Sequence, residues 1–227
     1  MDETYIIDIE KRHKIRSIGE MDELLDVLAS NIGSLTNPQR LMNTFRSIKK
    51  SKITAATINR YINYLGESFL LESARRYDVK GKRYIGTPMK YYFSDLGLRN
   101  AGINFRQIEP THSMENAIYN ELRIRGFAVD VKVVPVVEKN QKNIPVHKNL
   151  EVDFVANKGS KRYYIQSSYM LLDEEKKQQE YRPFRKIDDS FKKILITYDA
   201  PAPLYTEDGI LVMSLFDFFL GADSLDF

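Results

Sequence analysis

Apolar side chains recur at helical spacing three times within the first seventy residues. The first series occupies residues 21–32 and ends before Gly33, a residue that commonly follows a helix. The second begins at Asn37-Pro38, because asparagine caps helices and proline suits their first turn, and extends to residue 50. The third follows Thr54, another capping residue, and extends to Leu65. The pattern predicts three amphipathic helices, the last two forming a helix-turn-helix.

Two aromatic-rich segments, residues 69–77 and 89–94, follow the third helix and have the composition of β-strands. Between them lies the basic segment 78–83. Three helices followed by two strands and a basic connection predict a winged helix, with 78–83 as its wing.

From residue 113 helical and strand patterns alternate. We expect a helix at 114–126, strands at 128–134, 150–155, 162–169, 194–197 and 210–213, a charged helical segment at 173–186 and a closing helix at 216–220. Residues 138–149 are polar and predict a loop or hairpin tip. The predicted fold class is α+β, with a helical winged helix-turn-helix over residues 1–106 and an α/β domain over 107–227.

Composition excludes several classes of chemistry. The chain has no cysteine, and His13, His112 and His147 lack metal-ligand spacing, so neither thiolate zinc sites nor cysteine nucleophiles are available. It contains no apolar run long enough for a membrane span and no signal-peptide pattern at its start. These features predict a cytoplasmic protein without a membrane partner.

Charge is divided unevenly along the chain. Residues 1–37 carry a net charge of −4, residues 38–106 of +10 and residues 107–227 of −3. A basic block of this kind predicts a polyanion as partner, and we expect DNA. The residues expected to contact it are Arg60 and Asn63 on the third helix and Lys80, Lys82 and Arg83 in the wing. The alternative is a protein-docking domain whose basic block meets acidic surfaces, including those of further copies of the chain.

A second constellation involves Asp153, Gln166 and Ser168. If the two strands pair so that Asp153 faces Gln166, strict alternation places all three side chains on one face of the sheet. Glu115 would join them if its helix packs along that sheet. Oxygen ligands of this kind bind Mg²⁺, and a neighbouring cation would stabilise the charge that develops on an attacked phosphate.

This arrangement resembles the PD-(D/E)xK nuclease core, which has the order Asp, then an acidic residue, then lysine two positions later. Asp153 fits the motif, whereas Gln166 stands in place of the second acid and Ser168 in place of the lysine. The resemblance implies a restriction-endonuclease-like domain with a degenerate, inactive catalytic site. It also implies at most a weak Mg²⁺ site at Glu115, Asp153 and Gln166. The alternative is an active metal-dependent nuclease that recruits Lys161 or Lys176 from elsewhere.

A wider resemblance covers nearly the whole chain. Its motifs are similar to the C-terminal region of a prokaryotic family of AAA-type ATPases, and they lie at residues 5–9, 28–33, 61–65, 76–82, 92–100, 151–155 and 208–210. In that family a P-loop ATPase module comes first. No G-x-x-x-x-G-K-[ST] motif occurs here, so the resemblance implies that ATP binds only to a missing N-terminal module, which would be a further partner. The sequence therefore predicts a DNA-binding or DNA-sensing accessory region with no cofactor of its own.

Overall fold

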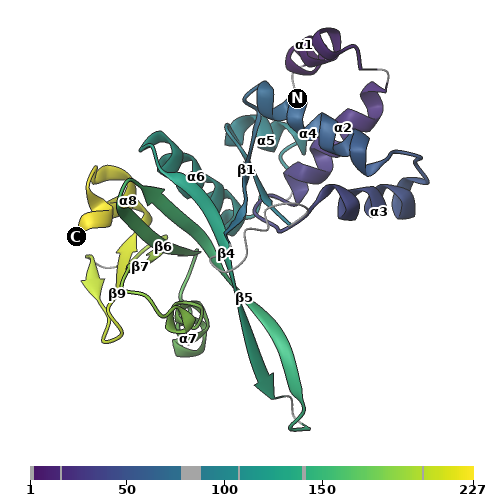
Figure 1. The fold of residues 1–227 in the computed structure, drawn as a ribbon. Helices are drawn as coiled ribbons and strands as arrows, with labels where there is room; N and C mark the ends of the chain where they lie inside the picture. Colours follow the sequence, from purple (N-terminus) through teal and green to yellow (C-terminus); the bar gives the residue numbers. More distant parts are fainter. Residues whose placement is uncertain (1–2, 16, 78–87, 107, 140–141, 201) are drawn as a thin grey trace. The chain divides into compact units, whose positions relative to one another are not determined.

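The computed structural model describes residues 3–15, 17–77, 88–106, 108–139, 142–200 and 202–227. The chain forms two compact units. The first comprises Met1–Arg75 and Ile85–Asn116, and the second comprises Arg76–Tyr84 and Ala117–Phe227. Helices and strands occur in both units (Figure 1), which confirms the mixed α and β composition.

The first unit is mainly helical. Its elements are α1 (Glu3–His13), α2 (Ile18–Ser30), α3 (Pro38–Lys49), α4 (Ala55–Glu67), β1 (Leu71–Ala74), β3 (Lys90–Phe93) and α5 (Leu96–Gly102). The predicted caps are present: the Asn37 side chain accepts a hydrogen bond from the Arg40 amide at 2.8 Å, and Thr54 caps α4 in the same way. Most apolar positions that define the three predicted helices are buried, as in Leu28, Phe45 and Ile58, but Ile48 near the end of α3 is 71% exposed.

Two short strands follow α4 in this unit. β1 and β3 pair antiparallel from Leu71 with Phe93 to Ala74 with Lys90. An isolated antiparallel bridge joins Thr36, which precedes α3, to Met89, which precedes β3.

The predicted strand at 69–77 divides into two pieces that belong to different sheets. Residues Arg76–Tyr77 form β2, which pairs in parallel with Val131 and Lys132 of the larger sheet. Exposed Arg75 separates it from β1. The backbone N–H and C=O groups of residues 76–77 bond to a different strand from those of β1. The side-chain pattern of 69–77 gives no sign of this change, because it does not depend on which strand the backbone pairs with.

The second unit contains a mixed sheet in the strand order β2-β4-β5-β6-β7-β9-β8. Its strands, after β2, are β4 (Ala128–Lys139), β5 (Pro145–Lys158), β6 (Lys161–Ser168), β7 (Lys192–Thr197), β8 (Leu204–Tyr205) and β9 (Ile210–Ser214). Its helices are the last part of α6 (Pro110–Ile124), α7 (Glu174–Tyr181), the 3-10 helix η1 (Phe184–Lys186), α8 (Leu215–Leu220) and the 3-10 helix η2 (Ser224–Asp226). Strands β6, β7 and β9 are parallel, and β4, β5 and β6 are antiparallel neighbours.

Of the two alternatives predicted for 138–149, a loop or a hairpin tip, the structure bears out the hairpin, but its strands extend farther than expected. Strand β4 continues to Lys139 and β5 begins at Pro145, so this segment belongs largely to a long two-stranded ribbon (Figure 1). Its cross-strand pairs continue from Val134 with Leu150 to Lys139 with Pro145. Backbone pairing requires no apolar alternation, which explains why a polar sequence forms strands here.

One face of the sheet is covered by α7 and η1. Tyr181, Phe184 and Ile187 pack there against an apolar cluster from the strands, which includes Val134, Val152, Val155, Tyr164, Leu195, Ile210 and Val212. In the part of the chain that the structure describes, no helix is long and apolar enough to cross a membrane.

Candidate functional site

The predicted register of the two motif-bearing strands agrees with the observed one. β5 pairs with β6 from Lys158 with Lys161 to Phe154 with Ile165. One further step along this register would place Asp153 opposite Gln166. The ladder ends before that step, and the Asp153 amide instead donates a hydrogen bond to the side-chain oxygen of Gln166 at 3.2 Å.

A β-bulge at Asp153 changes the direction of its side chain. The β4–β5 register passes from Asp130 with Val155 to Lys132 with Val152, so Asp153 and Phe154 together lie opposite the single residue Val131. An extra residue interrupts the two-residue alternation of a strand. Val152 and Val155 accordingly both contribute to the cluster under α7.

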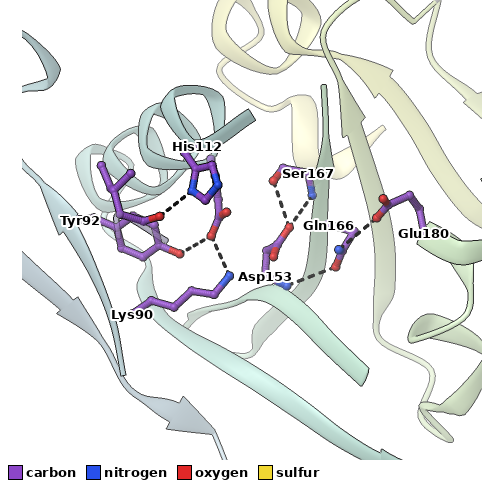
Figure 2. A network of polar contacts seen from close by, with 9 residues as sticks. Lys90, Tyr92, His112, Asp153, Gln166, Ser167 and Glu180 are labelled. Carbon is purple, nitrogen blue, oxygen red and sulfur yellow. Dashed lines mark hydrogen bonds and ion pairs between the residues drawn. The ribbon is translucent and has the colours of Figure 1, made fainter. Parts of the chain in front are cut away.

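The Asp153 carboxylate is bound by Ser167. One carboxylate oxygen, Oδ2, accepts hydrogen bonds from both the amide and the hydroxyl of Ser167, each at 3.0 Å (Figure 2). Ser168 donates its hydroxyl to the Met170 carbonyl at 3.3 Å and is buried. The expectation that Asp153, Gln166 and Ser168 share one face of the sheet was therefore wrong, because it assumed strict alternation through residue 153.

Gln166 connects the Asp153 backbone to a buried carboxylate that the sequence analysis did not name. Its side-chain nitrogen donates to Glu180 Oε2 at 3.1 Å (Figure 2), and Lys176 forms an ion pair with Glu180 Oε1 at 2.5 Å. Glu180 is only 8% exposed. The available signal was the spacing of Lys176 and Glu180, four residues apart in a helix, where oppositely charged side chains meet.

A second unanticipated group on the α7 side of the sheet is Lys132. Its ammonium donates to the Tyr164 hydroxyl at 3.3 Å, and that hydroxyl donates to Asp189 at 2.7 Å. Burial lowers the pKa of Lys132, while the negative charge of Asp189 opposes the shift. Burial, together with the hydrogen bond to Asp189, raises the pKa of Tyr164.

Lys161 was one of the two lysines considered as a replacement for the missing motif lysine. It pairs with Asp226 at 2.5 Å instead.

Glu115 is engaged within the first unit. Its Oε1 atom accepts hydrogen bonds from the Lys90 ammonium and the Tyr92 hydroxyl, both at 2.7 Å (Figure 2). Lys90 and Glu115 are both buried. A Cβ atom at Gly33, where φ is +72°, would lie 2.9 Å from Glu115 Oε2. This contact explains why glycine suits that position both sterically and conformationally.

The beginning of α6 is also fixed to β3 by Asn116, which is fully buried. Its side-chain oxygen accepts from the Phe93 amide at 2.7 Å, and its nitrogen donates to the Phe93 carbonyl at 2.8 Å. His112 approaches the Ile32 carbonyl at 2.7 Å through Nδ1. These bonds position Glu115 beside Lys90 and give it a structural role in the first unit.

The residues expected to bind metal are thus held by different partners. Glu115 belongs to the first unit, whereas Asp153 and Gln166 belong to the second. Among the described residues, no group of three or more histidine, aspartate or glutamate side chains is arranged to hold a metal ion. The proposed weak Mg²⁺ site stays a prediction.

Two of the five predicted DNA contacts fall on the surface of α4. Arg60 and Asn63 are exposed, while Ile58, Tyr61, Ile62 and Leu65 of the same helix are buried. The other three, Lys80, Lys82 and Arg83, lie outside the described residues.

Comparisons with known proteins cover both parts of the chain. Residues 1–109 match the family model of a domain of unknown function (DUF8612). An uncharacterized protein of Haemophilus influenzae is 30% identical over 96% of this chain and 50% of its own length. Uncharacterized protein MJ1544 of Methanocaldococcus jannaschii is 27% identical over 82% of this chain and 38% of its own length. The chain thus spans half or less of each of these two relatives.

A solved structure was also found. The crystal structure of protein VC1899 from Vibrio cholerae aligns over 88% of this chain and 54% of its own, with 11% identity and a TM-score of 0.28. That similarity is too low to bear on the fold or the function of this chain.

Proposed function

We propose that this chain is a DNA-binding or DNA-sensing accessory region of an AAA-type ATPase, with a winged helix and an inactive nuclease-like domain. The winged-helix assignment is supported by the order α2, α3, α4, β1, β3 and by the antiparallel pairing of the two strands. The bridge between Thr36 and Met89 adds a second short pairing beside the one between β1 and β3.

The surface of α4 is the observation that carries the proposal. In a helix-turn-helix the second helix enters the major groove, and its exposed side chains contact base edges and phosphates. Arg60 and Asn63 occupy the exposed side of α4, and arginine and asparagine are suited to guanine and adenine respectively. The surrounding segment 38–106 carries a net charge of +10, which favours a polyanion.

The ATPase association rests on sequence resemblance and on length. The motifs shared with the AAA-type family occur in this chain without a P-loop. The Haemophilus relative extends to about twice the matched length, which leaves room for a further module in that protein. ATP hydrolysis, on this proposal, belongs to such a module.

The proposal of an inactive nuclease-like site is supported by the partners of its residues. Asp153 is held by Ser167, Gln166 contributes no charge, and Ser168 bonds to a carbonyl. A phosphodiesterase needs converging anionic ligands for a metal and a cation beside the phosphate. We therefore expect no metal-dependent cleavage of linear, supercoiled or branched DNA.

The binding proposal is tested by fluorescence anisotropy with a labelled DNA duplex over a range of salt concentrations. About four to six phosphate contacts would give a log-log slope of roughly −4 to −5. Arg60→Ala with Asn63→Ala should lower affinity at least about ten-fold, since base contacts contribute about 1–3 kcal/mol each. Lys186→Ala is the matched control, because Lys186 is exposed and lies in the second unit. Absence of binding by the wild-type chain at low salt would refute the proposal.

A metal-dependent nuclease is the second candidate, and Glu180 is the observation that favours it. Gln166 lies between the Asp153 backbone and a buried carboxylate that is itself paired with Lys176. A carboxylate and a lysine are therefore available on α7 instead of on β6. Cleavage that requires Mn²⁺ and disappears in both Asp153→Ala and Glu180→Gln would establish this candidate.

A further inference from the structure

The β4–β5 arm, defined as residues 133–139 and 142–152, extends past the strands on either side of it (Figure 1). β2 pairs with β4 only at Val131 and Lys132, and β6 pairs with β5 only from Phe154 onward. Within the described strands the two sides of the arm therefore pair only with each other. Seven residues of strand span about 23 Å, so the arm is nearly as long as the eight-residue strand β6 of the sheet from which it projects.

The base of the arm is fixed to the second unit. Val134 and Val152 belong to the apolar cluster beneath α7, and Val136 and Leu150 pack against it. Farther along the arm, Glu138 pairs with Lys148 at 3.0 Å and with Arg182 after α7. Isolated two-stranded ribbons are marginally stable in water, and these contacts hold the arm in one orientation.

The outer edges of the arm are unsuited to the addition of another strand. Pro135 and Pro145 lie within its two strands and remain paired across the ribbon, so the missing N–H groups belong to the sides that pair with no other described strand. Prolines and lysines on an open edge discourage pairing with a further strand. A partner would therefore contact side chains instead of extending the sheet.

The arm is basic within an acidic half of the chain. Residues 107–227 carry a net charge of −3, yet the arm contains three lysines against two glutamates, Glu138 and Glu151, and Glu151 lies at its base. Glu138 is already paired with two cations. Lys139, Lys142, His147 and Lys148 are all exposed. The charge favours a polyanionic partner at the outer part of the arm.

We propose that the β4–β5 arm binds duplex DNA by entering its major groove, with Lys139 and Lys142 contacting phosphates. The major groove of B-form DNA is about 12 Å wide and admits a two-stranded β-ribbon. The major groove of duplex RNA is deep and narrow, which excludes the arm. This inference rests on DNA as the partner in the proposed function, but it assigns a contact surface in the second unit, separate from α4.

The first test compares Lys139→Ala/Lys142→Ala with the control Lys177→Ala/Lys186→Ala in the full chain. The arm variant should bind duplex DNA about ten-fold more weakly near 0.1 M salt, with a log-log salt slope flatter by about 1.8. The control should change affinity less than about two-fold, since its two lysines lie on α7 and η1. The affinity for duplex RNA should be the same in the arm variant and in the control variant, because the arm does not enter the major groove of RNA.

The second test uses the absence of native cysteine. Ile144→Cys places a single thiol in the exposed outer part of the arm, and Ser160→Cys places one in the exposed turn between β5 and β6. After attachment of an aryl azide, irradiation should cross-link duplex DNA to position 144 and not to position 160. Cross-linking of position 144 to a second copy of the chain instead would overturn the proposal.

The outcomes separate the two proposals. If the wild-type chain binds DNA, Arg60→Ala/Asn63→Ala weakens binding and the arm variant matches its control, the arm inference is refuted while the proposed function stands. If the wild-type chain binds no DNA, both are refuted. If the arm variant alone weakens binding, the arm inference is supported and the role assigned to α4 is refuted.

Discussion

Asp153 and Ser167 form two hydrogen bonds through a single carboxylate oxygen, one from the serine amide and one from its hydroxyl, each at 3.0 Å. Both residues are buried. The bulge in β5 brings this about by turning Asp153 away from Gln166. The residue that looked most like a metal ligand in the sequence therefore stabilises the junction of two strands.

Replacement of Asp153 should affect stability more than any activity. Asp153→Ala removes the acceptor for two buried donors, and we expect a loss of about 2–3 kcal/mol in the free energy of unfolding. Asp153→Asn retains one acceptor oxygen and should lose less. Urea unfolding followed by circular dichroism measures both variants. Equal stability of Asp153→Ala and the wild type would contradict the structural role.

The Gln166–Glu180 contact predicts the effect of restoring the motif acid. Gln166→Glu would place a second carboxylate beside Glu180, about where the amide nitrogen now lies 3.1 Å away. Repulsion should lower the melting temperature at pH 7, and acidification or millimolar Mn²⁺ should recover it. Gln166→Met, which loses the hydrogen bonds without adding charge, is the control and should not respond to Mn²⁺. The effect of adding Ser168→Lys on the melting temperature is harder to interpret, because Ser168 is buried.

A melting temperature that is insensitive to Mn²⁺ in Gln166→Glu would show that the two carboxylates do not converge on a shared cation. Gain of DNA cleavage in Gln166→Glu/Ser168→Lys would establish nuclease-like geometry even though the natural chain is inert. Thermal scans with and without metal, and a plasmid-nicking assay, provide the two readouts.

The buried Lys90–Glu115 pair predicts non-additive mutations. Lys90→Met or Glu115→Gln alone leaves one buried charge without its partner, and each should cost about 3–5 kcal/mol. The double variant should be more stable than either single variant, since neither charge is then buried alone. A double-mutant cycle by urea unfolding measures the coupling free energy between Lys90 and Glu115. Additive effects of the two substitutions would contradict the prediction.

Asp226 should contribute to the acid sensitivity of the second unit. A hydrogen bond from Lys161, and a further one from Tyr163, lower the pKa of Asp226 below its usual value. A depressed pKa in the folded state adds stability above the unfolded value, near pH 4, and this stability is lost as the pH falls further. Because Asp226 is largely exposed, we expect an effect well under about 1 kcal/mol.

The corresponding measurement is the difference in melting temperature between the wild type and Asp226→Asn from pH 7 to pH 2.5. The difference should stay constant above about pH 5 and shrink below about pH 4. Asp223→Asn, a nearby exposed substitution, should show no such change. A difference in melting temperature that grows toward low pH would contradict the prediction.

The three basic residues of the segment predicted to form a wing give a prediction that does not depend on the described structure. Lys80→Ala, Lys82→Ala and Arg83→Ala together should flatten the salt slope of DNA binding by up to about 2.7, without lowering thermal stability. A large loss of stability would mean that these residues have a structural role.

Local pattern was sufficient for most helices. Asn37 and Thr54 mark the beginnings of α3 and α4, and the three-to-four residue spacing of buried positions such as Leu24, Leu28 and Ile62 predicted the core side of each helix. Helix α5 was missed, because its seven residues are too short to show a period, although Asp95 caps it. Caps and helical periodicity are local properties, so a single sequence reveals them.

Strand pairing was decided by the tertiary structure. The sequence predicted that Asp153 and Gln166 would lie opposite each other, and the observed register leads to that position. It contained no sign of the bulge that redirects Asp153 to Ser167 or of the transfer of Arg76–Tyr77 to the larger sheet, and it did not show how far the strands of the hairpin at 138–149 extend. These features depend on backbone hydrogen bonds between distant residues, and such bonds leave no periodic trace in the side chains of either strand.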